Sequence, residues 1–265
     1  MILADLHVHT TFSDGNDTAE AMVQEAVRLG MDCIGFSDHS YTAFDLVWCM
    51  QKDMRERYRA EIRRLREKYR GQIRILLGLE YDYFSEEDPE EYDYTIGSVH
   101  YIRMGEEYLP VDGSREKQLD AIRRYFGGDP IGFAEKYFET AADVVRKTRC
   151  DIIGHFDLVV KFNEKDPYID TEDPRYIAAY RNALDALLPS GKPFELNVGA
   201  VARGYRTDPY PSLNIRKEIA ERGGKLLLSS DSHAVNTLMY RFPEFRAFEN
   251  ADTEEVISGF RNTKD

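Results

Sequence analysis

Short apolar runs that suit β-strands alternate with helical patterns along almost the whole chain. The strand-like runs cover residues 5–9, 33–39, 73–83, 94–102, 150–159, 193–200 and 225–233. The helical patterns cover residues 17–30, 51–69, 117–126, 132–148, 174–188 and 211–223. Parallel strands need such crossover helices, so the alternation predicts an α/β fold with a parallel sheet. The 265 residues are about the length of one α/β barrel, and we predict a single domain over residues 1–265.

Local signals set the expected limits of these elements. Asn16 or Asp17 could cap the first helix, and Gly30 could end it. Pro211 is expected to open the last clear helix, because proline is tolerated in a first helical turn. Residues 101–114, residues 161–173 and the stretch near Tyr205 are expected to be long loops that follow strands.

Composition limits where the protein works and what it binds. With 42% hydrophobic and 31% charged residues, and no apolar run long enough to cross a bilayer, the chain resembles a globular protein rather than a membrane protein. Its start lacks the pattern of a signal peptide, and three scattered cysteines do not suit a disulfide framework, so we expect a cytoplasmic protein. A net charge of −13 disfavours a nucleic-acid partner.

Polar residues gather where the strand-like runs end. In the first run, DLHVH, a period of two places Asp5, His7 and His9 on one face. That face alone could belong to an amphipathic edge strand. The later runs, however, end in further candidate ligands: His39, Glu80, His100, His155, Asp231 and His233. All six histidines of the chain are in this set, and in a parallel barrel the carboxyl ends of the strands form one rim.

Six imidazoles beside several carboxylates in one pocket indicate bound metal. They cannot all be protonated at short range, whereas divalent ions stabilise neutral imidazole and ionised carboxylate together. Nitrogen and oxygen ligands without thiolate favour Zn, Mn or Fe. With Asp5, Asp14, Glu80 and Asp231, the histidines provide enough donors for two or three ions.

The motifs in this order resemble those of the PHP (polymerase and histidinol phosphatase) family. They are DLHVH (5–9), SDH (37–39), Glu80, SVH (98–100), GHFD (154–157) and DSH (231–233). The continuation HTTFSDG, the stretch from Glu195 and the chain length are similar to the monofunctional histidinol-phosphate phosphatases of that family. The resemblance implies a distorted (β/α)7 barrel and the hydrolysis of L-histidinol phosphate, a step of histidine biosynthesis.

The resemblance also implies a ligand set for each ion. The first ion would be held by His7, His9, Glu80 and Asp231, the second by Glu80, His100 and His155, and the third by Asp14, His39 and His233. Glu80 would thus bridge two ions, and Asp14 is the ligand on which members of the family differ. Asp5 is expected to accept a hydrogen bond from the N–H group of a ligand imidazole rather than to bind a metal ion itself. Asp38 and Asp157 could serve either in that way or as general acids, so the catalytic candidates are Asp14, Glu80 and Asp157.

Divalent ions at such a site favour phosphoester hydrolysis, because they activate water and stabilise phosphoryl oxygens. Lys161 and Arg203 follow strand ends and are the candidate phosphate-binding cations. The family often has Arg where Lys161 and Ala202 stand, so the substrate could instead be a nucleotide or a sugar phosphate. A nonenzymatic module, as in polymerases that contain PHP domains, is a further alternative. Acidic loops around Glu86 and Glu106 could bind an amine or simply be solvated, and aromatic residues such as Trp48 and Tyr101 could stack on an imidazole or pack the barrel mouth.

Overall fold

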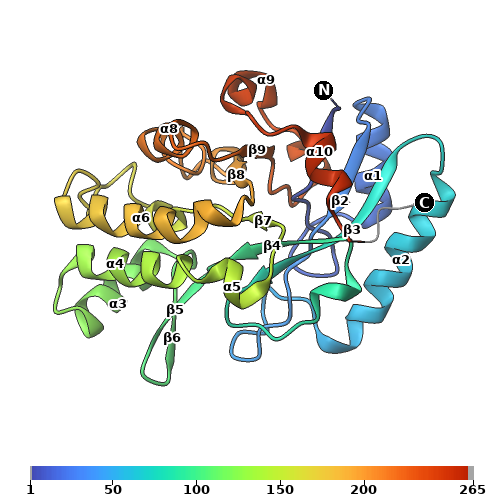
Figure 1. The fold of residues 1–265 in the computed structure, drawn as a ribbon. Coiled ribbons are helices and arrows are strands. Elements are labelled where there is room, and N and C mark those ends of the chain that lie inside the picture. Colours follow the sequence, from blue (N-terminus) through green and yellow to red (C-terminus); the bar gives the residue numbers. More distant parts are fainter. Residues whose placement is uncertain (1, 262–265) are drawn as a thin grey trace.

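Seven parallel strands form the centre of the protein in the computed structural model, which describes residues 2–261 (Figure 1). In sheet order they are β1 (Ala4–Asp5), β2 (Cys33–Phe36), β3 (Arg74–Asp82), β4 (Tyr94–Ser98), β7 (Ile152–Ile153), β8 (Phe194–Asn197) and β9 (Leu226–Ser229). Each strand lies beside the next one of the central sheet in chain order, with β5 and β6 left out as a separate hairpin. This topology is that of a barrel with helical crossovers.

The first and last strands meet at the carboxyl end of the sheet. Val8 and Ser232 form a parallel bridge, in which the His9 amide donates to the Ser232 carbonyl at 2.8 Å and the Ser232 amide donates to the His7 carbonyl at 3.1 Å. The sheet therefore closes into a barrel, although β1 and β7 are only two residues long. The predicted distorted (β/α)7 barrel is confirmed.

Ten α-helices surround this sheet among residues 2–261 (Figure 1). They are α1 (Ala19–Arg28), α2 (Arg55–Lys68), α3 (Arg115–Tyr125), α4 (Pro130–Ala141), α5 (Val144–Thr148), α6 (Pro174–Leu187), α7 (Gly199–Ala202), α8 (Leu213–Glu221), α9 (Phe242–Phe245) and α10 (Thr253–Ser258). Short 3-10 turns lie at Lys52–Met54, Pro89–Glu91, Leu158–Val160, Leu188–Ser190, Val235–Thr237 and Arg246–Phe248. Across residues 2–261, every helix is too short or too polar to span a lipid bilayer.

The barrel interior is filled by apolar side chains around Tyr94. This tyrosine is fully buried, and its hydroxyl donates to the Leu6 carbonyl at 2.6 Å. A Cβ atom at Gly35 or Gly78 would lie 2.3 Å from the Tyr94 side chain, so only glycine leaves room for the ring. The packed interior leaves the strand ends as the place where polar groups can gather.

Four local predictions are wrong. The α1 cap is Thr18, whose hydroxyl accepts from the Ala21 amide at 3.2 Å, because the Asp17 carboxylate instead accepts from the Val235 amide at 2.9 Å. Residues 101–114 contain an antiparallel hairpin of β5 (Tyr101–Met104) and β6 (Glu107–Pro110) that turns at Gly105, which has a φ of +61°.

The other two differences concern helix limits. The single helix predicted over residues 132–148 is two helices, α4 and α5, because the Asp143 amide donates to the Thr140 carbonyl and tightens the chain between them. Pro211 lies outside α8, which begins at Leu213 with Ser212 at its N-cap. The Ser212 amide and hydroxyl both donate to Asp157, and these bonds hold the chain at Ser212 just before the first helical turn.

Candidate metal centre

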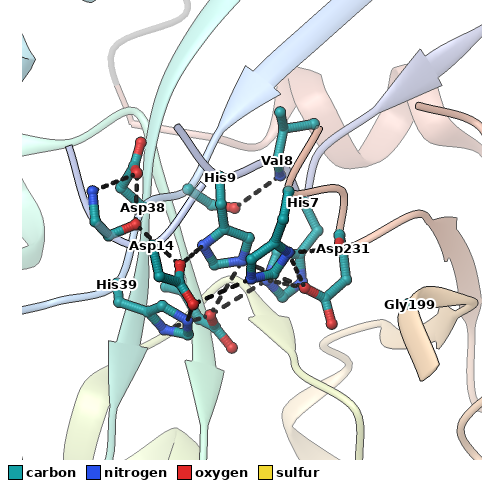
Figure 2. Close-up of polar contacts among 12 residues, drawn as sticks. His7, Val8, His9, Asp14, Asp38, His39, Gly199 and Asp231 are labelled. Carbon is teal, nitrogen blue, oxygen red and sulfur yellow. Dashed lines mark hydrogen bonds and ion pairs between the residues drawn. The ribbon is translucent and has the colours of Figure 1, made fainter. Parts of the chain in front are cut away.

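All six histidines meet at the carboxyl end of the barrel. The ring centroid of His9 lies 5.0 Å from that of His7, 4.4 Å from that of His39 and 4.1 Å from that of His233. The His100 ring lies 5.1 Å from both His39 and His155. Figure 2 shows His7, His9, His39, Asp14 and Asp231 turned toward one another. The predicted convergence of the histidines is confirmed.

Glu80 lies at the centre of this group. Its carboxylate oxygens are 3.3 Å from His7 Nε2, 3.5 Å from His9 Nε2, 2.8 Å from His39 Nδ1, 3.2 Å from His100 Nε2 and 2.9 Å from His155 Nε2. The side chain is 1% exposed, so its charge cannot be stabilised by bulk water. Glu80 therefore lies where a bridging ligand would be needed.

Two further carboxylates complete the cluster. Asp231 Oδ1 is 3.3 Å from His9 Nε2 and 3.9 Å from His7 Nε2. Asp14 Oδ2 is 3.3 Å from His233 Nε2 and 3.6 Å from His39 Nε2. Three groups have donor atoms close enough to share an ion: His7, His9 and Glu80; His39, Glu80 and His100; and His9, Asp14, His39 and His233. The third group contains every residue of the predicted third site.

Buried polar atoms without hydrogen bonds show that a cation fits here. They include His7 Nε2, both ring nitrogens of His9, His39 Nδ1 and Glu80 Oε2. An unpaired buried polar atom is costly, and such atoms in native proteins call for an explanation. Burial lowers the pKa of His9 to about 3, and the neighbouring His233 and His39 add to the effect. A neutral imidazole with free lone pairs is the form that binds a divalent metal.

Two acidic residues orient the candidate ligands and were missed in the sequence. Glu195 Oε1 is 2.6 Å from His7 Nδ1, which leaves Nε2 of His7 facing Glu80. Asp82 Oδ2 is 3.3 Å from His100 Nδ1 in the same way. Such contacts set the tautomer and direction of a ligand imidazole. Asp82 stands two residues after Glu80 on β3, so the strand period could have indicated it.

Asp5 and Asp38 stabilise the backbone around the centre. Asp5 accepts from the amides of His7 at 3.4 Å and Ser230 at 3.1 Å, so its predicted contact with an imidazole ring is wrong. Glu195 makes that contact instead. Asp38 accepts four hydrogen bonds from the amides and hydroxyls of Thr10 and Ser13, and thereby fixes the loop that carries Asp14. With both oxygens so engaged and no exposed surface, Asp38 is suited to a structural role.

Asp157 lies apart from the imidazole cluster. Its Oδ2 accepts from the Ser212 amide at 2.9 Å and from the Ser212 hydroxyl. Its side chain is fully buried, and within residues 2–261 no hydrogen bond or ion pair joins it to a histidine. These contacts tie the loop after β7 to the start of α8.

The two candidate phosphate-binding cations have different surroundings. Arg203 reaches the centre, with Nη2 2.9 Å from Asp231 Oδ2 and Nη1 3.1 Å from His233 Nδ1. Lys161 donates to the Asp112 carbonyl at 3.1 Å, and its amino group is 3.7 Å from the Asp112 carboxylate. Arg203 thus contacts the cluster directly, whereas these contacts of Lys161 are with Asp112.

A pocket of about 310 Å³ adjoins the cluster. Asp14, His39 and His100 of the cluster line it, and its other charged and aromatic lining residues are Asp45, Trp48, Tyr101, Asp112 and Lys117. Glu106, by contrast, lies in the turn between β5 and β6 with its side chain 95% exposed. The pocket gives a small molecule access to the histidines from one side.

A closed parallel barrel with a buried histidine and carboxylate cluster at its carboxyl rim defines a metallohydrolase-like class of protein. Residues 5–199 match the PHP domain family, and because this span covers most of the chain, the protein belongs to that family. Asp231 and His233 lie beyond the matched span, and the structure brings them to the other candidate ligands.

Relatives and solved structures give more particular likenesses. The histidinol-phosphatase of Bacillus subtilis is 27% identical in an alignment that covers 91% of this chain and 97% of that protein. The structure of hisK from Listeria monocytogenes aligns with a TM-score of 0.80 at 20% identity, over 91% of this chain and 99% of the other. A third similar protein is the histidinol phosphate phosphatase of Lactococcus lactis, whose structure was solved with zinc, L-histidinol and phosphate. It aligns with a TM-score of 0.69 at 22% identity, over 98% of this chain and 94% of the other. At these identities the two solved structures establish the fold.

Proposed function

We propose that this protein is a metal-dependent phosphatase that hydrolyses L-histidinol phosphate to L-histidinol and inorganic phosphate. The observation that carries the proposal is the buried Glu80 carboxylate, which lies within 3.5 Å of a nitrogen of each of five histidines. A carboxylate and imidazole cluster of this kind, open to a small pocket, suits divalent ions and phosphoryl transfer.

The relatives support the choice of substrate. The Bacillus subtilis protein, similar over nearly the full length of both chains, is a histidinol-phosphatase. The Lactococcus lactis enzyme, which shares the fold, was solved with zinc, L-histidinol and phosphate. A small phosphomonoester is therefore the partner that we propose for this pocket.

Three sets of residues would hold the ions. We assign His7, His9, Glu80 and Asp231 to the first, Glu80, His100 and His155 to the second, and Asp14, His39 and His233 to the third. When bound, two or three ions of Zn, Mn or Fe supply an activated water and neutralise charge on the phosphoryl oxygens. Glu195 and Asp82 hold the imidazoles of His7 and His100 in the required tautomers.

The remaining groups act on the phosphate and on protons. Water adds to phosphorus, the ester P–O bond breaks, and the leaving alcohol oxygen takes up a proton. Although burial would raise the pKa of Asp14, the imidazoles of His39 and His233 outweigh it and hold the pKa below its usual range. Asp14 is therefore ionised, the form in which a carboxylate binds a divalent ion, and we assign it as a ligand at the pocket. Arg203 and Lys161 are assigned to the phosphoryl oxygens, and Asp157 stays a candidate general acid.

A substrate panel tests this proposal. The purified protein is stripped with a chelator, reloaded separately with Zn, Mn or Fe, and assayed with L-histidinol phosphate, nucleotide monophosphates, sugar phosphates and p-nitrophenyl phosphate. We expect the highest kcat/KM with L-histidinol phosphate and no turnover in the stripped protein. A higher kcat/KM with a nucleotide or sugar phosphate would replace the proposed substrate. No phosphate release with any metal would indicate a nonenzymatic module.

A further inference from the structure

The pocket beside the histidines is also lined by charged and aromatic side chains that are not candidate metal ligands. Asp14, His39 and His100 of the histidine cluster line the pocket, and its other charged and aromatic lining side chains, which make up the outer part, are Asp45, Trp48, Tyr101, Asp112 and Lys117. The pocket side chains include three carboxylates and one ammonium group, so their formal charge is negative. If the phosphate lies against the histidines, this outer part receives the organic portion of the substrate.

Asp45 is the carboxylate of this region that has no counter-ion. Its Oδ2 accepts from the Tyr101 hydroxyl at 2.7 Å, and its Oδ1 accepts from the Val47 amide at 3.4 Å. Within residues 2–261, no Lys, Arg or His nitrogen lies within ion-pair distance of it. Asp112, in contrast, lies 3.7 Å from the amino group of Lys161. The negative charge of Asp45 is therefore available to a ligand.

A chain of hydrogen bonds holds Asp45 in place. The Trp48 indole Nε1 donates to the Tyr101 hydroxyl at 2.8 Å, and that hydroxyl donates onward to Asp45. Tyr101 begins β5, while Asp45 and Trp48 lie on the loop between β2 and α2. The contact thus fixes a loop carboxylate against a strand, and it limits the rearrangement that ligand binding would require.

Trp48 joins this carboxylate to the histidines. Its ring centroid lies 4.4 Å from that of His39, with an interplanar angle of 85°, and 5.4 Å from that of His100. A group that leaves the histidines toward Asp45 passes along the indole. An aromatic wall beside a free carboxylate suits a ligand that has both a flat ring and a positive charge.

We infer that Asp45 binds the ammonium group of the substrate and that Trp48 packs against its organic part, so that these residues select a phosphomonoester with a primary amine near the ester. The inference rests on the proposed function and adds to it the residue that recognises the amine. Tyr101 acts as a positioning residue for Asp45. The solvated acidic loop at Glu106 has no part in this recognition, since that side chain lies on the exposed hairpin turn.

The test compares two substrates in three proteins. The substrates are L-histidinol phosphate and its desamino analogue, 3-(imidazol-4-yl)propyl phosphate, which keeps the ring and the phosphate. The proteins are the metal-loaded wild type, Asp45→Asn and the matched surface control Glu106→Gln. Since a hydrogen bond to a charged partner in a site contributes a factor of about ten or more, we expect the wild type to prefer the amine by about tenfold. Asp45→Asn should lose this preference, mainly through KM, and Glu106→Gln should keep it.

A second variant and a binding measurement guard against a folding defect. Tyr101→Phe should weaken the preference for the amine by a smaller factor. Calorimetric titration with L-histidinol should give weaker binding to Asp45→Asn than to the wild type.

Two results would overturn the inference in different ways. A wild type that hydrolyses p-nitrophenyl phosphate but not L-histidinol phosphate would remove both the proposed function and this inference. A wild type that hydrolyses L-histidinol phosphate well, with an Asp45→Asn variant that retains the full preference for the amine, would remove the inference alone.

Discussion

The two ends of strand β3 differ in whether their charged and polar groups have partners within the protein. Near its start, Arg74 borders an open cavity of about 870 Å³, in which Arg66 pairs with Asp93, Arg70 with Glu67, and Arg74 with Glu254. Near its end, Glu80 adjoins a smaller pocket of about 310 Å³, where buried ring nitrogens have no hydrogen-bond partner. The two residues are six positions apart, which is about 20 Å along a strand.

The comparison shows that volume is a poor guide to function in this molecule. At the larger cavity each of these cations has an acidic partner, and the cationic side chains are partly exposed, as is usual for ion pairs at a protein surface. In the histidine cluster beside the smaller pocket, Glu80, His7 and His9 are buried, and polar atoms of all three have no hydrogen-bond partner in the protein. Groups kept in that state at a cost in stability mark a functional site.

Replacing Glu80 should give the largest effect. Glu80→Gln removes the negative charge among five imidazoles, and because metal ions supply several kcal/mol of transition-state stabilisation, we expect kcat to fall by about 10³-fold. Initial rates with L-histidinol phosphate at saturating metal measure this. A loss of less than tenfold in a metal-loaded variant would show that Glu80 is not central.

Glu195→Gln, at the same end of the barrel, should lower metal affinity or activity by a smaller factor than Glu80→Gln. It weakens the contact at 2.6 Å that orients His7, and loss of such a partner lowers metal affinity or activity by about 10- to 100-fold. Competition with a chromophoric chelator gives the affinity, and steady-state rates give the activity. Unchanged values for both would assign Glu195 to packing alone.

Lys161→Met should change KM more than kcat. If the ammonium group binds phosphoryl oxygens, its loss should raise KM by about tenfold, the usual size for a charged hydrogen bond. Lys161→Arg is the matched variant and should recover part of the loss. If neither variant alters KM, Lys161 serves only to hold Asp112 through the contact with its carbonyl.

At the other end of β3, Asp93→Asn should leave activity unchanged and lower stability. Asp93 is 3% exposed and accepts from the Leu77 amide at 2.8 Å and from Arg66. Its replacement should cost about 1–2 kcal/mol, which corresponds to a fall in Tm of about 2–4 °C for a chain of this size. Thermal unfolding and kcat are measured on one preparation. A tenfold loss of kcat in a folded variant would contradict the separation between the two ends.

Much of the fold and the cluster could be predicted because the signals are local. A period of two places Asp5, His7 and His9 on one face, and alternating strands and helices bring the ends of β2, β4 and β7 to the same rim. The histidines at those ends therefore meet, whatever the details of the loops.

The partners of the ligands could not be predicted in the same way. His7 and Glu195 are 188 residues apart, and their contact at 2.6 Å depends on the closure of the barrel. The hairpin of β5 and β6 and the contact between Tyr101 and Asp45 depend likewise on how a loop folds back over the rim. The extent of the catalytic domain, the cytoplasmic location and the lack of a nucleic-acid partner stay predictions.

Anomalous scattering from crystals grown with phosphate tests the central claim most directly. Data collected at the Zn, Fe and Mn absorption edges identify each ion and its position. We predict two or three peaks among the six histidines, with Glu80 between two of them and a phosphate oxygen in contact with at least two. A fully metal-loaded preparation whose maps contain no anomalous peak near Glu80 would contradict the account.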